Sequence, residues 1–236
     1  MEISTEKSQI LVNSQNNRPA KIHVKGNTLE EVDQFKYLGV TLTKDGKSTV
    51  EIKKRIGMAT AAMTRLIVIW KSSINLTIKL KLYKSLVTSI LLYGCEAWTL
   101  TADLEKRICT FENKCYRKIL RVSYREHRTN EDILEEITAR TGRQEPLLST
   151  VKRRKLSWFG HTLRHDGLCK TVLQGTVEGQ RKRGRQRKQW QDNIKEWTGK
   201  SIQELNVTAR NRDEWRRLVK SAARMSPRRS TAGHGS

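Results

Sequence analysis

The densest group of charged side chains in the sequence is a basic run near the C-terminal end. Arginine and lysine neutralise phosphates and release counterions, and arginine can fork onto a single phosphate. Because Gly184 interrupts the run, we expect an extended segment that contacts a nucleic-acid backbone. A nuclear-localisation signal and a solvated charge run are the alternatives. The basic residues of the run are Arg181, Lys182, Arg183, Arg185, Arg187 and Lys188.

A second candidate set is His161, His165 and Cys169, which follow one another with the spacing H-x3-H-x3-C. A continuous helix would place all three on one face, where they would resemble three ligands of a zinc site. However, Asp166-Gly167 is expected to end the helix before Cys169, and no fourth ligand follows at a recognised spacing. We therefore expect core or surface residues and no metal, with zinc as the less favoured alternative.

Motifs that mark common enzyme classes are missing from the sequence. It contains no G-x-S-x-G, no Walker loop and no H-E-x-x-H. Its carboxylates are scattered, and no expected strand carries the two adjacent aspartates that two-metal phosphoryl transfer requires. We expect no cofactor for this chain.

The composition favours a polyanion as the partner. The 236 residues carry a net charge of +23, and residues 151–236 hold 22 basic and 7 acidic side chains, a net charge of +15. A protein this basic usually meets nucleic acid.

Apolar runs such as 66–70 and 90–93 are too short to cross a bilayer, so no membrane partner is expected. The four cysteines show no C-x-x-C spacing, which favours a reducing, intracellular compartment, nucleus or cytoplasm.

The elements that would position these residues indicate a mostly α protein with a small β part (α+β). Residues 1–45 carry strand signals: a hairpin is expected around the turn Gly26-Asn27, and residues 35–42 are expected as one strand with a bulge or close backbone approach at Gly39. Residues 46–142 have the apolar period of a helical bundle, opened by a capping box from Ser48 to Glu51.

The C-terminal third is also expected to be helical. Residues 146–165 form a predicted helix with Pro146 in its first turn, and a glycine-rich loop over 167–184 precedes three short helices. Trp190 could stack on a base, but Trp190, Trp197 and Trp215 are better explained as the core of this unit. The expected regions are 1–45, 46–142, 143–225 and a disordered tail, 226–236.

Several segments, taken in order, resemble one known family. They are E-V-D-Q-F-K-Y-L-G-V-T-L-T-K-D-G, E-I-K-K-R-I, L-Y-K-S-L-V-T-S-I-L-L-Y-G-C-E-A-W-T-L, F-E-N-K-C-Y-R-K-I-L, W-F-G-H-T-L-R-H and R-K-R-G-R-Q-R-K-Q-W-Q-D-N-I-K-E-W. The combination resembles the end of the palm, the thumb and the C-terminal region of non-LTR (LINE-type) retrotransposon endonuclease–reverse transcriptases. It extends to about Arg217, and it is specific as a combination although each piece alone is weak.

The resemblance implies roles for particular residues. F-K-Y-L-G is similar to the primer grip, which holds the 3′ end of the growing DNA; the matching positions are Phe35, Tyr37, Leu38 and Gly39. The helix from Glu51 resembles the first thumb helix, and it implies that Lys53, Lys54 and Arg55 face the primer–template backbone. Lys7 matches the family's lysine near the incoming nucleotide.

The sequence departs from the family at the catalytic residues. The family's Y-x-D-D turn and the strand with its third aspartate would lie upstream of Met1, and this sequence contains neither. The chain is therefore expected to be a truncated or decayed element copy, or a gene model cut at an internal methionine. Mg²⁺ is expected only in an intact reverse transcriptase, because nothing here would hold two such ions.

The resemblance thus implies a fragment of an RNA-directed DNA polymerase that is inactive alone. Its expected partners are RNA and DNA, as template–primer or target DNA. The alternative is a stand-alone basic nucleic-acid-binding protein that has no enzymatic role and for which the nucleus is one candidate location. The sequence does not indicate an oligomeric state.

Overall fold

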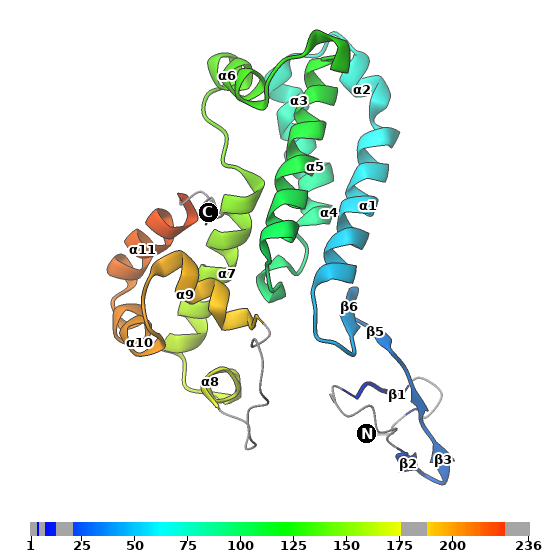
Figure 1. Cartoon of the computed structure of the whole chain (residues 1–236), viewed down its shortest axis with the longest axis vertical. Coiled ribbons are helices and arrows are strands. Elements are labelled where there is room, and N and C mark those ends of the chain that lie inside the picture. The colour runs from blue at the N-terminus through cyan, green and yellow to red at the C-terminus, as the bar shows by residue number, and fades with distance from the viewer. Residues whose placement is uncertain (1–3, 5–7, 13–20, 176–187, 225–236) are drawn as a thin grey trace, which may run out of the picture.

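The computed structural model describes residues 4, 8–12, 21–175 and 188–224, and it confirms a mostly α protein with a small β part. Two long helices, α1 (Thr49–Arg65) and α5 (Ala102–Leu120), run side by side, and α7 (Leu147–Arg164) packs next to α5 (Figure 1). The short strands lie beyond the N-terminal end of α1. No helix in the described part of the chain is long and apolar enough to cross a membrane.

The described strands form three two-stranded sheets. The pairs are β1 (Gln9–Ile10) with β4 (Glu30–Glu31), which is parallel, and the antiparallel pairs β2 (His23–Val24) with β3 (Asn27–Thr28) and β5 (Gln34–Tyr37) with β6 (Val40–Thr43). The expected first hairpin is present as β2–β3. Its turn is Lys25-Gly26, one position earlier than predicted, because these two residues have the positive φ angles, 50° and 81°, of a two-residue hairpin turn.

The prediction of one strand over residues 35–42 is wrong. Leu38 and Gly39 have φ angles of 47° and 81°, and Tyr37 pairs with Val40, so the chain reverses in a two-residue type I′ turn. Gly39 tolerates this left-handed conformation without a steric cost, whereas Leu38 adopts it against its preference. The glycine therefore marks a hairpin tip and not a bulge.

The expected helical bundle is present over residues 49–141, with two departures from regular α-helix. The predicted first helix breaks at Leu66, and the second contains a π-helical stretch. The shorter elements of the bundle are α2 (Ile67–Lys71), α3 (Leu76–Leu82), the π-helix η2 (Tyr83–Thr88), α4 (Ser89–Leu91), the 3-10 turns η3 (Cys95–Ala97) and η4 (Tyr124–Glu126), and α6 (Asn130–Thr141).

The predicted capping box at the start of α1 is wrong. Ser48 is the N-cap, but its hydroxyl accepts a hydrogen bond from the backbone N–H of Thr99 at 2.9 Å and caps nothing in α1. Glu51 instead accepts from the backbone N–H of Thr41 at 2.7 Å and pairs with Arg55. A tertiary contact thus replaces the local one.

In the described part of the C-terminal region, four helices follow α7, one more than predicted. They are α8 (Leu168–Gln174), α9 (Trp190–Thr198), α10 (Ile202–Arg210) and α11 (Arg212–Arg224). The unexpected one is α8, which lies within the glycine-rich segment. The capping box from Ser201 to Glu204 is confirmed at the start of α10. The predicted tail, 226–236, lies outside the described residues.

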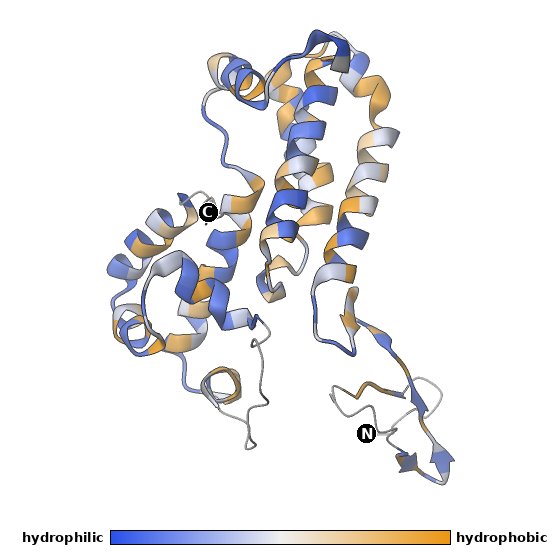
Figure 2. Ribbon diagram, in the orientation of Figure 1, coloured by the Kyte–Doolittle hydropathy of each residue, from blue (hydrophilic) through white to orange (hydrophobic). Residues whose placement is uncertain are grey.

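One buried cluster extends through the bundle and the C-terminal helices, from Ile52 to Ala222. Figure 2 shows the apolar residues as stripes on helices whose other sides are polar. Trp197 and Trp215 are buried in this cluster and Trp190 packs against it, as predicted. The division of the chain near residue 142 stays a prediction.

Candidate nucleic-acid interface

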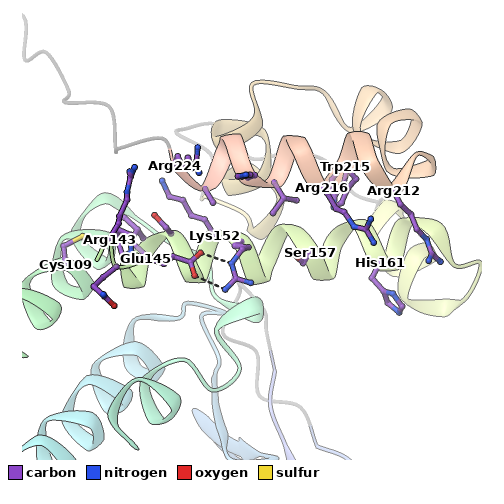
Figure 3. A pocket seen from close by; sticks show the side chains of 18 of the residues that line it. Cys109, Arg143, Glu145, Lys152, Ser157, His161, Arg212, Trp215, Arg216 and Arg224 are labelled. Atoms are coloured by element: carbon purple, nitrogen blue, oxygen red, sulfur yellow. Dashed lines mark hydrogen bonds and ion pairs between the residues drawn. The ribbon is translucent and has the colours of Figure 1, made fainter. Parts of the chain in front are cut away.

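A groove of about 1160 Å³ lies between α7 and α11 (Figure 3). Its lining is strongly basic, because eight of the lining residues are lysine or arginine and Glu145 is the one carboxylate among them. The basic lining residues are Arg143, Lys152, Arg153, Arg164, Arg212, Arg216, Lys220 and Arg224. The arrangement offers a polyanion many positive partners on one side of the molecule.

Half of these cations come from α11, where they recur at every fourth residue. Helical geometry spaces the Cα atoms of Arg212, Arg216, Lys220 and Arg224 about 6 Å apart along the axis. The helix begins at a side-chain cap, since Asn211 Oδ1 accepts from the backbone N–H groups of the next turn at 3.0 and 3.2 Å. The buried side of α11 carries the apolar residues that hold it on α7.

The contact between α7 and α11 depends on an indole and a glycine. Trp215 is 3% exposed, and its Nε1 donates to the backbone carbonyl of Leu156 at 3.2 Å. The ring lies over Gly160, which has no side chain to keep the helices apart. Phe159 packs beside the indole with ring centroids 6.1 Å apart. Of these residues, Trp215 lines the groove, and it forms the floor between the two helices.

The charges around the groove are only partly balanced. Arg153 forms two hydrogen bonds with Glu145, at 2.8 and 3.1 Å, and this contact lowers the pKa of the Glu145 carboxyl. Burial lowers the pKa of Arg164, and the nearby charges of Arg212 and Arg216 lower it further. Like charges in this groove therefore repel one another, and a bound anion would relieve that repulsion.

The opposite side of α7 is bonded to the bundle through a buried lysine. Lys155 is fully buried, and its ammonium donates to the carbonyl of Trp98 at 2.7 Å and to Asn193 Oδ1 at 3.1 Å. Burial, and then the charge of Lys188, lowers the pKa of Lys155 to about 7. The ammonium also lies 4.4 Å from the ring centroid of Trp190.

Segment 92–98 is held to the C-terminal helices by further polar contacts. Arg154 donates to the carbonyl of Leu92 at 3.1 Å, and the Trp190 indole donates to the carbonyl of Glu96 at 2.8 Å. Just beyond the segment, the Asn193 side chain bonds both backbone groups of Leu100, at 2.7 and 2.8 Å. These contacts position α7 and α9 against the bundle.

The same segment also holds the β5–β6 hairpin. Arg55 is 7% exposed; it donates to the carbonyl of Gly39 at 2.6 Å and to Glu51 at 2.6 Å, and it lies over the Tyr93 ring at 4.6 Å. The Tyr93 hydroxyl donates to the carbonyl of Leu38 at 2.8 Å. Both carbonyls of the hairpin turn thus accept from side chains of the bundle.

The primer-grip-like residues lie on this hairpin. Tyr37 and Leu38 are exposed at its tip, at 59% and 73%, Gly39 is exposed beside them, and Phe35 is half-buried. Lys53 and Lys54 are exposed on α1 nearby. Lys54 donates to the hydroxyl of Thr41 at 3.1 Å, whereas Arg55 is directed at the hairpin turn.

The structure describes only one residue of the C-terminal basic run. Lys188 precedes α9 and forms an ion pair with Glu196 at 2.7 Å. Arg181, Lys182, Arg183, Arg185 and Arg187 lie outside the described residues, as does Lys7.

The three residues considered as zinc ligands are not gathered into one site. The rings of His161 and His165 lie 4.4 Å apart between centroids, both exposed at the edge of the basic groove. The helix ends at Arg164, as expected, and Cys169 is exposed on α8. Among the described residues, no three histidine, cysteine or acidic side chains are grouped to hold a metal.

Sequence reasoning missed the groove, although part of its signal was visible. The four-residue spacing of cations on α11 was readable in the predicted final helix. The cations on α7 and before it are more than 45 residues away from α11 in the chain, so only the packing of the two helices shows that they line the same surface.

Comparison with known proteins gives an informative similarity. The chain is 29% identical to an uncharacterized transposon-derived protein of Caenorhabditis elegans over 233 residues, which cover 93% of this chain and 83% of that protein. This similarity points to a transposon-related origin. No protein-family model and no solved structure matches the chain.

Proposed function

We propose that this chain is part of a LINE-type retrotransposon reverse transcriptase and that it positions RNA template and DNA primer by their phosphate backbones. The observation that carries this proposal is the groove between α7 and α11, with eight cationic lining residues and one carboxylate. Such a surface favours a polyanion, and phosphate contacts position a nucleic acid without reading its sequence. The similarity to a transposon-derived protein supports the retroelement context.

The bundle and the hairpin are proposed to contribute a second contact. Lys53 and Lys54 are exposed on α1, next to the hairpin tip that carries Tyr37 and Leu38. In this proposal the two lysines meet the primer–template backbone, and Arg55 contributes by fixing the hairpin turn. Intact family members would add Mg²⁺ at carboxylates that this sequence lacks, so we expect no polymerase activity from the chain alone.

The test is a binding titration with a labelled RNA–DNA primer–template at several salt concentrations. We expect binding at low salt and a linear fall of log affinity with log salt, with a slope of about −0.7 to −0.9 per phosphate contact. Absence of binding at 50 mM salt would refute the proposal. Primer extension with Mg²⁺ and deoxynucleotides should give no product above a control without protein.

A stand-alone nucleic-acid-binding protein is the second candidate. It is favoured by one observation: all the residues that line the groove, apart from Cys109, belong to residues 143–224. The two candidates differ in what they expect of α1. The double substitution Lys53→Gln with Lys54→Gln should weaken primer–template binding if α1 acts as a thumb helix of a reverse transcriptase. It should have no more effect than Lys114→Gln with Lys118→Gln on α5 if the groove acts alone.

A further inference from the structure

We propose that the groove between α7 and α11 takes one single nucleic-acid strand, held by its phosphates and not by its bases. This inference rests on the proposed function, because it assumes that the partner is a nucleic acid, and it names the form of that partner. The groove combines a regular row of cations, a shape too narrow for a duplex and a floor that offers no stacking surface.

The row of cations lies on one wall. Arg212, Arg216, Lys220 and Arg224 follow one another at about 6 Å intervals along α11. No carboxylate that the structure shows lining the groove belongs to α11. Asp213 pairs with Arg216 at 2.9 Å, but both of these side chains are at least 75% exposed, so water and salt weaken that pair. A strand of phosphates presents the matching regular row of anions.

The opposite wall, formed by α7 and the residues before it, also carries four of the lining cations, but three of these are bonded within the protein or buried. Arg164 donates to the backbone carbonyl of Ala209 at 3.3 Å. The cation of Arg153 is engaged by Glu145, and serine side chains at 149 and 157 supply neutral hydroxyls. Lys152 is 2% exposed, so it contributes to the field more than to direct contact. The charge is therefore asymmetric, which suits a ligand with one charged edge.

The shape excludes a duplex from the groove. Helices in contact lie about 8–10 Å apart between axes, and α7 touches α11 at Gly160 and Trp215. A B-DNA duplex is broader than its own major groove, which is about 12 Å wide. The duplex is therefore broader than the distance between the axes of α7 and α11 and cannot enter between these helices. A duplex would meet only the rim, whereas one strand can lie between the walls.

The floor of the groove gives bases nothing to stack on. Proteins that hold single strands through their bases use exposed aromatic faces. Trp215 is the one tryptophan, tyrosine or phenylalanine among the residues shown to line the groove, and it is 3% exposed, with its ring against Gly160. The exposed imidazole rings of His161 and His165 lie at the edge of the groove, away from this floor. Recognition is therefore of the backbone, and sequence should matter little.

The experiment measures fluorescence anisotropy of the full chain with a labelled 12-nucleotide strand, as RNA and as DNA, and with the duplex of the same sequence. The loss variant is Arg212→Gln with Arg216→Gln and Lys220→Gln. Its matched control, Lys106→Gln with Lys114→Gln and Lys118→Gln, removes the same charge from the exposed side of α5. A second variant, Glu145→Gln, removes the ion-pair partner of Arg153. If this variant binds more tightly than the wild type, the change cannot be explained by unfolding of the groove.

We expect the wild-type chain to bind a single strand, RNA or DNA, at least tenfold more tightly than the duplex. The loss variant should reduce the salt slope for the single strand by about 2, and Glu145→Gln should increase it by about 0.7, while the control stays near the wild type. Permuting the base sequence should change affinity less than threefold.

Each failure has a separate meaning. No binding of any nucleic acid by the wild-type chain would overturn the proposed function as well. If the chain binds but the loss variant and the α5 control fall equally, or if the duplex competes as well as the strand, the groove proposal fails and the function stands. Equal binding of polyglutamate would also overturn the groove proposal, because the groove would then accept any polyanion.

Discussion

Trp215 lies so close to Gly160 that a Cβ atom at position 160 would be 2.0 Å from the indole Nε1 and 2.2 Å from Cε2. Real contacts of this kind do not occur, so the packing of α11 on α7 requires a glycine at this position. The indole is buried and hydrogen-bonded to the carbonyl of Leu156, which leaves it little freedom to move aside.

Replacing this glycine should separate the two helices. Gly160→Ala should lower the free energy of unfolding by about 1–3 kcal/mol through overpacking, despite the better helix propensity of alanine. Urea denaturation measures the change. Gly57→Ala in α1 is the matched control: no atom lies within 4 Å of its Cβ position, so it should stabilise the chain by about 0.5–1 kcal/mol. Equal effects at both positions would contradict the packing described for Trp215.

Arg55 should matter for stability because it neutralises a buried carboxylate. Burial by itself would raise the pKa of Glu51, but hydrogen bonds from Arg55 and from the N–H of Thr41 lower it. Arg55→Met should therefore cost about 3–5 kcal/mol, by leaving Glu51 unpaired. In a double-mutant cycle, adding Glu51→Gln should recover part of that loss. Arg65→Met, exposed on the same helix, should change stability by less than about 0.5 kcal/mol. If the effects of Arg55→Met and Glu51→Gln on the free energy of unfolding were strictly additive, the two side chains would not interact.

Lys155 should make stability depend on pH in the alkaline range. Its pKa is lowered from 10.5 to about 7 by burial, so the unfolded chain binds a proton that the folded chain lacks between these values. The resulting stabilisation is fully present above pH 10.5. As the pH falls from 10.5 to 7, the free energy of unfolding decreases by about 1.4 kcal/mol per pH unit, and the stabilisation is lost below pH 7. Unfolding free energies at pH 7, 8 and 9 should rise less steeply in Lys155→Met than in the wild type. Lys195→Met, exposed on α9, should follow the wild-type curve; parallel curves for Lys155→Met and the wild type would exclude this assignment.

Glu112 should give the opposite dependence in the acid range. Its carboxylate accepts from the backbone N–H of Leu147 at the start of α7 and from the Tyr116 hydroxyl, yet burial raises its pKa to about 7. The folded chain therefore holds this proton to higher pH than the unfolded chain. The resulting stabilisation is present below pH 4.5 and is lost as the pH rises through 7. Glu112→Gln should remove this fall between pH 5 and 7, and Glu135→Gln, exposed on α6, should not. A fall that persists in Glu112→Gln would have to come from other groups.

The helices were predictable because their apolar residues recur every three or four positions. The stripe from Leu104 to Ile119 predicts α5, and the box from Ser201 to Glu204 predicts the start of α10, since both signals are local. The same local reasoning failed at Ser48, because its hydroxyl accepts a hydrogen bond from the backbone N–H of Thr99, 51 positions away in the chain. It failed again at Leu38-Gly39, where the turn is fixed by Arg55 and Tyr93, which lie on other elements.

The candidate site was predictable in its chemistry but not in its place. Net charge indicated a polyanion, and the most visible basic run, 181–188, drew attention to one continuous segment. The groove is instead assembled from cations spread along α7, α11 and the residues before α7. Periodicity along one helix cannot show which other helix faces it, so the pairing of the two walls required the fold.

Segment 92–98 is contacted from two directions. Tyr93 bonds the hairpin turn, and Gly94 lies against Val40, while Leu92 and Trp98 bond Arg154 and Lys155 of α7. These seven residues belong neither to the hairpin nor to the groove, yet they set the distance between them. Because the segment bonds the hairpin on one side and α7 on the other, a substitution that displaces it should move both surfaces together.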